Sequence, residues 1–361
     1  MIFHFSDFSG RHIAYIDWKA DKTDPMHPSS VLKREFEKNE DLIIEQTRIV
    51  KTRDIPSSYL QEFFRPLDII GHYYMDASKF DFDDLRRAQA RIMHIAQKFD
   101  FKVLYSIYSM IAATYVSKTK ETRRDFTEIS DYLNSAIEIY QEILESLSIK
   151  DNPSIYVDTQ KKVGDIYLKL SEYQDRKKNC GRAIGAYEEA LKIYTLDDFP
   201  IDYAFVQNNL GAAYETLAEI EDKAKNCKKA IKACEEALRI RTPKDFPMWY
   251  ATTQNNLGVV YHTLTEIEDT IENCKKAIKA YEKALKVNTL DDFPMQYAAT
   301  QNNLGNAYNT LVRVAKKTEN CKKAIEAYEK ALKIYKSEKF PGIHQELELN
   351  IRMLLDFCED E

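Results

Sequence analysis

The sequence predicts an all-α fold, a solenoid of helical hairpins stacked side by side, and three periodic features indicate it. The pair Phe-Pro recurs every 47 residues along the 361-residue chain, and the tetrapeptide Asn-Asn-Leu-Gly recurs with the same period. A fixed period of this length is typical of repeat proteins, in which each unit packs on its neighbours. Between these marks, apolar residues step by three and four, the spacing of one helix face. Phe-Pro begins at Phe199, Phe246, Phe293 and Phe340, and the tetrapeptide occupies 208–211, 255–258 and 302–305.

Residues 1–56 form an N-terminal segment whose role the sequence does not reveal. Residues 1–28 have too many aromatic residues for a disordered tail, but they are too few to build a core of their own. We expect either a short hairpin here or a strap laid on the first helices. Residues 29–50 have an amphipathic pattern that predicts a helix.

Residues 57–152 contain two degenerate copies of the repeat. Ile111, Ala112 and Tyr115 match the first helix of the regular unit, and Ala136 and Tyr140 match its second helix. The first helix is displaced by five residues relative to the later units, which predicts an inserted loop at 118–125. The earliest helix pair is predicted at 70–95.

Residues 153–340 contain four regular units, each predicted to be a pair of helices. In the unit that starts at Pro200, apolar positions from Tyr203 to Leu217 mark the first helix. A second apolar stripe begins at Cys227, and Asn226 is expected to cap that helix. Proline precedes each first helix, where its missing N–H is harmless.

A glycine recurs in the middle of each first helix, where it costs about 1 kcal/mol relative to alanine. We expect this glycine to permit close approach of the paired helix, opposite a recurring alanine. The glycines are Gly164, Gly211, Gly258 and Gly305, and the alanines are Ala183, Ala230, Ala277 and Ala324.

Residues 341–361 are predicted to form one capping helix. Its apolar residues would cover the last helix pair, and its acidic residues would present a polar back to water. The predicted architecture is therefore about six helix pairs followed by a C-terminal capping helix.

The regular unit resembles the tetratricopeptide repeat. Leu210, Gly211 and Tyr214 match the first-helix signature of that family. Ala277 and Tyr281 match its second-helix signature. The family's usual unit has about 34 residues, so the present unit is about 13 residues longer and is similar to long prokaryotic repeats, with some likeness to kinesin light chain repeats.

Two alignments of the extra residues stay open. They lie either partly between the two signatures and partly at the linker, or all at the end of the unit. In both cases the resemblance implies a right-handed superhelix whose first helices line a concave groove that binds proteins.

Within that groove, paired asparagines would form a ladder of side-chain amides. A helix advances about 100° per residue, so Asn208 lies opposite the core-facing Leu210, and Asn209 lies at the flank. Each amide offers a donor and an acceptor, which suits the backbone of an extended peptide, while varying neighbours would select its side chains. The ladder comprises Asn208, Asn209, Asn255, Asn256, Asn302 and Asn303; the varying positions include Phe205, Thr252, His262, Asn306 and Asn309; and Lys161 is a candidate for a peptide carboxylate.

A purely structural explanation of these residues stays open. Helices need polar outer faces, and duplication of the unit alone copies an asparagine into every repeat. Mid-helix asparagine has a lower helix propensity than Glu, Lys or Gln, which favours the ladder. Lys161 is near Asp158 and Asp165 in the sequence, which favours a solvated charge at that position.

Composition narrows the classes of partner. The chain has 58 acidic and 52 basic residues, interspersed, and a net charge of -6, so no broad basic face is available for nucleic acid. No apolar run approaches the ~20 residues needed to cross a bilayer. We therefore expect a cytoplasmic protein that binds neither nucleic acid nor a membrane.

Catalytic, cofactor and metal sites are not predicted. The sequence lacks a phosphate-binding glycine loop, a nucleophile elbow and a His-Glu-x-x-His motif. His4, Asp7 and His12 are ligand types in one segment, but no helix or hairpin is established to hold them together. Equivalent residues of successive repeats lie about 10 Å apart, too far for a disulfide or a shared zinc, so the periodic cysteines are expected to be buried apolar residues. These are Cys180, Cys227, Cys274 and Cys321.

The sequence therefore favours a non-enzymatic adaptor that holds a protein or peptide segment in its groove. An alternative is a sensor or regulatory module that controls an activity in residues 1–56 or on a partner enzyme. Self-association through tyrosine-rich edges or an exposed end of the array is a third hypothesis.

Overall fold

The computed structural model describes residues 2–6, 12–16, 69, 81–96, 101–119, 126–147, 150, 152–315 and 317–359. These residues belong to two compact units, Met1–Ser148 and Ile149–Glu361, which we describe separately. The predicted α–α solenoid is confirmed, because the described residues form twelve helices and, in the second unit, each helix packs on the next. A two-stranded hairpin is added to them at the N-terminal end.

The first unit contains this hairpin and three helices. Strand β1 (Ile2–Ser6) pairs antiparallel with β2 (His12–Ile16), with Ile2 opposite Ile16 and Ser6 opposite His12. The hairpin is one of the two structures expected for residues 1–28. The helices predicted at 29–50 and around 70–74 lie outside the described residues.

Helices α3 (Phe82–Ala96), α4 (Phe101–Lys118) and α5 (Phe126–Ser146) complete the described part of this unit. Their core includes Ile111 and Leu133, both fully buried. Seven residues separate α4 from α5, whereas four or five separate the two helices of each regular unit. The linker is therefore two or three residues longer, which is less than the five-residue displacement in the sequence.

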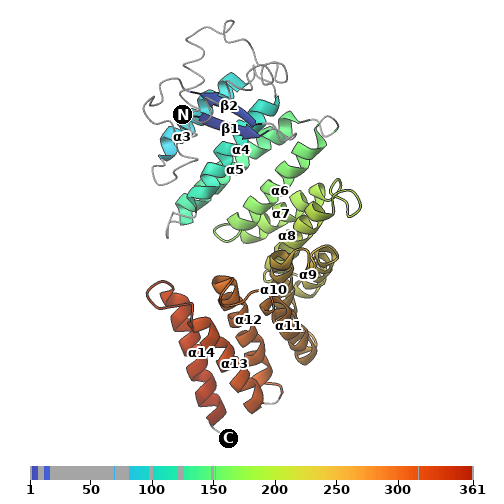
Figure 1. The fold of residues 1–361 in the computed structure, drawn as a ribbon, viewed down its shortest axis with the longest axis vertical. Helices are drawn as coiled ribbons and strands as arrows, with labels where there is room; N and C mark the ends of the chain where they lie inside the picture. Colours follow the sequence, from blue (N-terminus) through green and yellow to red (C-terminus); the bar gives the residue numbers. More distant parts are fainter. Residues whose placement is uncertain are drawn as a thin grey trace. The chain divides into compact units, whose positions relative to one another are not determined.

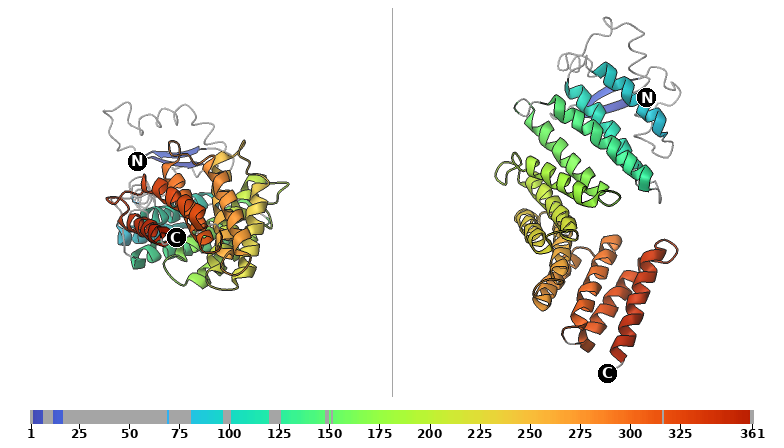
Figure 2. Two further views of the ribbon diagram at one scale, coloured as in Figure 1. Left: turned by 90° about the horizontal axis from the view of Figure 1, so that it is seen from below. Right: turned by 180° about the vertical axis from the view of Figure 1, so that it is seen from behind.

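The second unit contains four helical hairpins and a final single helix (Figures 1 and 2). Each first helix packs on its own second helix, and each second helix packs on the next first helix. The hairpins are α6 (Pro153–Leu170) with α7 (Arg176–Ala190), α8 (Pro200–Ala218) with α9 (Lys223–Leu238), α10 (Pro247–Leu264) with α11 (Thr270–Leu285), and α12 (Pro294–Val312) with α13 (Lys317–Leu332); α14 (Pro341–Glu359) follows.

The turns inside the first three of these hairpins each contain an aspartate in the left-handed conformation. Asp175, Asp222 and Asp269 have φ values of 41°, 44° and 45°, which aspartate tolerates better than most residues. The expected N-cap role of Asn226 is wrong, because α9 begins three residues earlier, at Lys223. Instead, Asn226 Nδ2 donates a hydrogen bond to the Glu221 carbonyl at 2.8 Å and closes the turn.

The mid-helix glycines permit close helix packing, but their predicted partner is wrong in three of the four units. A Cβ at Gly164 or Gly305 would lie 2.5 Å from a ring carbon of Tyr187 or Tyr328, and a Cβ at Gly258 would clash with Tyr281. The ring, not the recurring alanine, therefore requires glycine there. In the unit of Gly211, Cys234 replaces the tyrosine.

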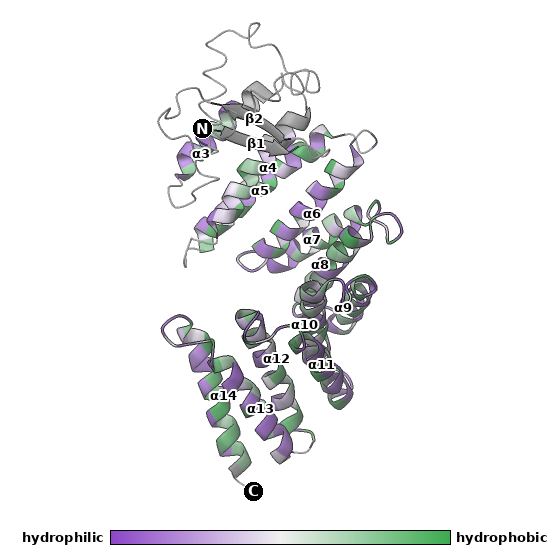
Figure 3. Cartoon of the chain, viewed as in Figure 1, coloured by the Kyte–Doolittle hydropathy of each residue, from purple (hydrophilic) through white to green (hydrophobic). Residues whose placement is uncertain are grey.

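The last helix covers the array, and its solvent side carries exposed apolar residues as well as the exposed acidic residues that the sequence predicts. Leu347 and Leu354 of α14 are buried against the core around Tyr328. On the solvent side, Leu349 and Met353 are 53% and 56% exposed, and Figure 3 shows apolar residues along this helix.

One periodic cysteine departs from the prediction. Cys180, Cys227 and Cys274 are free and buried, as expected. Cys321 is also buried, but it forms a disulfide with Cys358 of α14, with Cα atoms 6.7 Å apart. The argument from repeat spacing missed this bond because Cys358 lies outside the period.

Candidate functional site

The first helices of the second unit share one face, which we call the first-helix face. It consists of Phe205, Asn208, Asn209, Ala212 and Glu215 of α8, with the residues at the same repeat positions in α6, α10 and α12. Hydrogen bonds between side chains of α8 and those of α6 and α10 show that successive first helices meet along this face. The periodic sequence positions therefore become neighbours in space.

The asparagines of this face bond to one another from unit to unit. Asn208 Oδ1 accepts hydrogen bonds from Thr253 Oγ1 at 2.9 Å and from Asn256 Nδ2 at 3.3 Å. Asn303 Nδ2 donates to Asn255 Oδ1 at 3.3 Å. The predicted row of amides is therefore aligned, but much of its hydrogen-bonding capacity joins neighbouring helices.

Asn208 departs most from the expectation of amides that face an open channel. Its side chain is only 6% exposed, and its Nδ2 donates to Asn209 Oδ1 at 3.1 Å. The other five ladder asparagines are half-buried. Among them, Asn302 has a buried Oδ1 that accepts no hydrogen bond from any described residue.

The varying positions lie on the same face; His262 contacts the next unit, and Asn306 contacts the second helix of its own unit. His262 Nε2 lies 2.9 Å from Thr310 Oγ1, and burial lowers the pKa of this histidine. Asn306 Oδ1 accepts a hydrogen bond from the Tyr328 hydroxyl at 2.7 Å, and Asn309 is half-buried beside it. Thr252 is exposed.

Two carboxyl groups of this face have raised pKa values. Burial, reinforced by nearby Glu219, raises the pKa of Glu215 to about 7. Burial also raises the pKa of Asp165, although hydrogen bonds from Tyr187 and Asn209 oppose the shift. The middle of this face therefore disfavours the ionised form of both carboxyl groups.

Lys161 is not a free cation. Its Nζ lies 3.3 Å from Asp158 and 4.0 Å from Asp202, and 5.6 Å from the centre of the Phe205 ring. The neighbouring carboxylates therefore offset its charge. This agrees with the explanation in the sequence analysis that Lys161 is a structural surface charge and not a peptide-binding residue.

The sequence analysis missed an aromatic and cationic cluster on this face. The ring centres of Phe205 and Trp249 are 6.2 Å apart in an edge-to-face arrangement, and Trp249 is 38% exposed. The Arg241 guanidinium lies 5.4 Å from the Phe205 ring and 5.7 Å from the Trp249 ring. We call these three residues the aromatic cluster.

Arg241 is a buried cation without a carboxylate partner in the described part of the chain. It is 3% exposed, its Nη1 donates to Thr253 Oγ1 at 2.8 Å, and its Nε has no hydrogen-bond partner. Burial lowers the pKa of this guanidinium to about 10. Such a group is costly to bury unless an anion or an aromatic ring compensates its charge.

Comparing units could have found the cluster. The positions equivalent to Arg241 hold Tyr194, Asn288 and Tyr335, and those equivalent to Trp249 hold Asp202 and Gln296. Both rows vary between units, and Arg241 and Trp249 are the residues that introduce a cation and a large aromatic ring into them. The cluster is therefore signalled by residues that differ between units, whereas the asparagine ladder was predicted from residues that repeat in successive units.

No cluster of three or more His, Cys, Asp or Glu side chains suitable for a metal ion occurs among the described residues. Of the segment with His4, Asp7 and His12, Asp7 lies outside those residues. None of the helices in the described part combines the length and apolarity required to cross a membrane.

Comparison with known proteins connects the regular unit to one family. Residues 251–294, which cover most of α10 and all of α11, match the family model described as a tetratricopeptide repeat. A comparison with curated proteins gave no match.

Several solved structures are similar at low identity. The MamA protein is 19% identical, with 63% of this chain and 93% of MamA covered and a TM-score of 0.37. BtubC (BKLC) from P. vanneervenii is 19% identical, with 75% and 90% covered and a TM-score of 0.41. Yeast Tom70 is 13% identical, with 92% and 76% covered and a TM-score of 0.29. With TM-scores below 0.5, these similarities do not indicate how the present chain functions.

Proposed function

We propose that this chain, which is a tetratricopeptide-repeat protein, is a non-enzymatic scaffold that binds a segment of another protein along its first-helix face. The observation that supports this most is the aromatic cluster, where an exposed tryptophan, a second ring and a buried arginine occur together. Tryptophan and arginine are enriched among the residues that dominate protein interfaces.

We assign different roles to the two parts of this face. The aromatic cluster would anchor the partner, because Trp249 offers apolar surface and Arg241 lacks a carboxylate. The half-buried amides from Asn255 to Asn303 would contact its backbone. Asn208 would act by holding α8 and α10 in register.

The partner is proposed to be a protein or peptide in the cytoplasm. Binding of nucleic acid is disfavoured by the net charge of -6, since phosphate contacts need clustered cations. No cofactor is required for binding of this kind.

Site-specific photocrosslinking in the native host tests the face. A crosslinking amino acid at the exposed Thr252 should trap the partner, whereas one at the exposed Lys232 of α9 should not. Mass spectrometry of the adducts identifies the partner. Equal trapping from both positions would contradict the proposal.

The anchor is then tested by affinity. Trp249→Ala should weaken partner binding by about 2 kcal/mol, roughly thirtyfold, as expected for an interface anchor. Met248→Ala is the matched control, because Met248 is the preceding residue in the sequence and is 48% exposed. Trp249→Ala is expected to lower stability because Trp249 packs against Phe205 and Phe246, so affinities are compared at a temperature at which thermal unfolding shows both variants folded. Equal affinities for the two variants would exclude the cluster as the anchor.

A further inference from the structure

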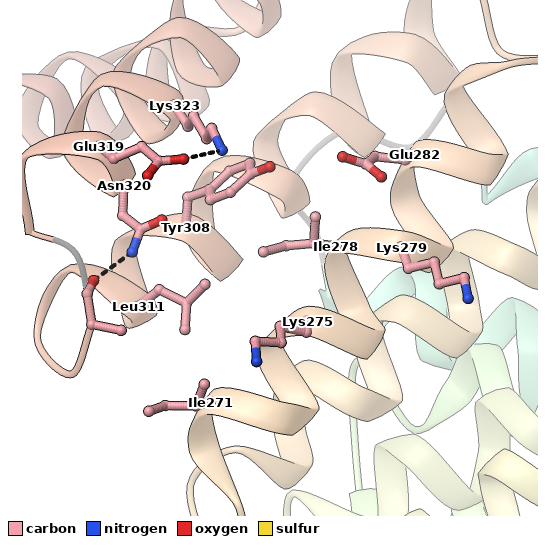
Figure 4. Close-up of a pocket in the computed structure, with 11 residues that line it drawn as sticks. Ile271, Lys275, Ile278, Lys279, Glu282, Tyr308, Leu311, Glu319, Asn320 and Lys323 are labelled. Carbon is pink, nitrogen blue, oxygen red and sulfur yellow. Dashed lines mark hydrogen bonds and ion pairs between the residues drawn. The ribbon is translucent and has the colours of Figure 1, made fainter.

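A cleft of about 640 Å³ lies away from the first-helix face, between α11 and the α12–α13 hairpin (Figure 4). We call it the α11–α13 cleft. Ile271, Ile278 and Leu311 provide apolar surface, and Lys275 and Lys279 lie on the α11 side. Its volume is within the range of roughly 300–1,000 Å³ that is common for ligand pockets.

The cleft coincides with a break in a pattern of ion pairs between units. Where α7 meets the next hairpin, Arg176 pairs with Glu219 and Lys177 pairs with Glu221. Where α9 meets the next hairpin, two further pairs form at the corresponding place. These are Lys223 with Glu266 and Lys228 with Glu268.

The junction between α11 and α12–α13 has lost both pairs. Thr270 and Arg313 occupy the positions of Lys223 and Glu266, and Ala315 occupies the position of Glu268. Lys275, which is equivalent to Lys228, is therefore left without its carboxylate. Neither Lys275 nor Lys279 forms an ion pair with a described residue, whereas Lys323 across the cleft is paired with Glu319.

A second replacement makes the same junction more apolar. Ile271 is 42% exposed and occupies the position of Lys177 and Ala224 in the earlier units. Together, Ile271 and Ala315 leave apolar surface beside unpaired ammonium groups, where the other junctions have ion pairs. The cleft lining contains three lysines and two glutamates, and because Lys323 pairs with Glu319, Lys275 and Lys279 face Glu282 as the remaining carboxylate. The lining therefore has a net positive charge.

We propose that the α11–α13 cleft binds an acidic amphipathic helix of a partner protein. Apolar side chains of that helix pack on Ile271, Ile278 and Leu311, and its carboxylates pair with Lys275 and Lys279. A helix suits this place better than a strand, because α11, α12 and α13 already use their backbone groups internally and offer no edge for β-pairing.

A fluorescently labelled helical peptide serves as the probe. It has leucines at i, i+3, i+4 and i+7 and glutamates beside them, and a comparison peptide has lysine in place of glutamate. The acidic peptide should bind the full chain, bind more weakly at high salt, and bind more tightly than the lysine peptide, because exposed ion pairs are screened.

The decisive variant restores the missing acid. Ala315→Glu offers Lys275 the partner that Lys228 has in Glu268, so it should weaken binding of the acidic peptide by about tenfold or more. Val314→Glu is the matched control, since Val314 is 48% exposed, adjacent in sequence, and absent from the residues that line the cleft. Ile271→Gln provides a second test at an exposed position that folding does not require.

Several outcomes overturn the proposal. These are absence of binding at millimolar peptide, equal binding of the lysine peptide, or equal effects of Ala315→Glu and Val314→Glu. If Trp249→Ala weakens binding of the acidic peptide, the peptide binds at the first-helix face instead. That result would contradict the cleft proposal but not the proposed function. If sedimentation shows a dimer that Ala315→Glu dissociates, a second copy of this chain occupies the cleft, and the proposed partner is wrong.

Discussion

At the scale of single residues, the proposed role of Arg241 would serve binding at the expense of stability. The equivalent Tyr194 and Tyr335 pack against Phe199 and Phe340, with ring centres 5.5 and 5.3 Å apart. Arg241 places a charge in the same kind of buried position, where two aromatic rings and Thr253 contact it but no carboxylate of the described residues does. Its presence there is explained if a partner supplies the anion that the chain lacks.

Replacing this arginine should separate stability from binding. Arg241→Tyr is expected to increase the free energy of unfolding by about 1 kcal/mol or more, because a desolvated charge is removed and a ring contact becomes available. Urea unfolding measures this change. The same variant should bind the partner less tightly, and a variant that is both destabilised and fully active would contradict this assignment.

Glu215 predicts a pH dependence of stability. Its folded-state pKa of about 7 lies above the ordinary value of 4.5, so folding favours the protonated carboxyl. Its contribution to stability is therefore full below pH 4.5 and is lost as the pH rises through about 7. In Glu215→Gln the free energy of unfolding should decrease less over that interval, whereas the exposed control Glu329→Gln should keep the parental profile. Urea titrations across the pH range measure both.

At the scale of elements, α14 is held to α13 by buried leucines and by the Cys321–Cys358 disulfide. The helix is amphipathic only in part, since Leu349, Met353 and Phe357 remain at its surface. The attachment of α14 therefore depends on its leucine-containing buried face and on the disulfide.

Removing the disulfide should loosen this helix. Cys358→Ser, or reduction of the parent with dithiothreitol, is expected to lower the free energy of unfolding by about 2–4 kcal/mol, because the unfolded chain is no longer constrained. Denaturant unfolding with and without reductant measures the change. If the reductant affects Cys358→Ser as much as it affects the parent, the disulfide is not the cause.

The helices were predictable because the residues that indicate them lie close together in the sequence. Proline at the start of each first helix and apolar residues at helical spacing placed α6 to α14 within a few residues. Asn226 was misassigned because the left-handed Asp222, rather than a capping side chain, begins α9. The sequence does not reveal that conformation directly.

The candidate site was predictable only in part. The repeat period placed the asparagines on one face, but it could not show that Asn208 turns toward Thr253. Arg241 and Trp249 come from different elements, so no single helical stripe joins them. Such contacts depend on the packing of neighbouring units, which a search for repeated residues does not detect.

At the scale of the whole molecule, the second unit contains its own series of cores, each shared between adjacent hairpins. A linear array of this kind gains stability from neighbouring contacts and does not need distant parts of the chain.

The second unit is accordingly expected to fold alone. A fragment of residues 149–361 should show a helical circular dichroism spectrum and cooperative thermal unfolding, because its hairpins keep their neighbours. It should also bind the partner of the first-helix face. An unfolded fragment would show that residues 1–148 are needed to stabilise the array.

The missing ion pairs between α11 and α12–α13 also have a mechanical consequence. Each exposed ion pair stabilises the fold by at most about 1 kcal/mol. Because these pairs lie at the edge of the stacked helices, far from the bending axis, they resist bending more than a central contact of equal strength. The array should therefore be most compliant at this junction. Flexing there would alter the distance from Trp249 to Asn303, so a single chain could accommodate binding segments of unequal length without altering the packing inside any hairpin.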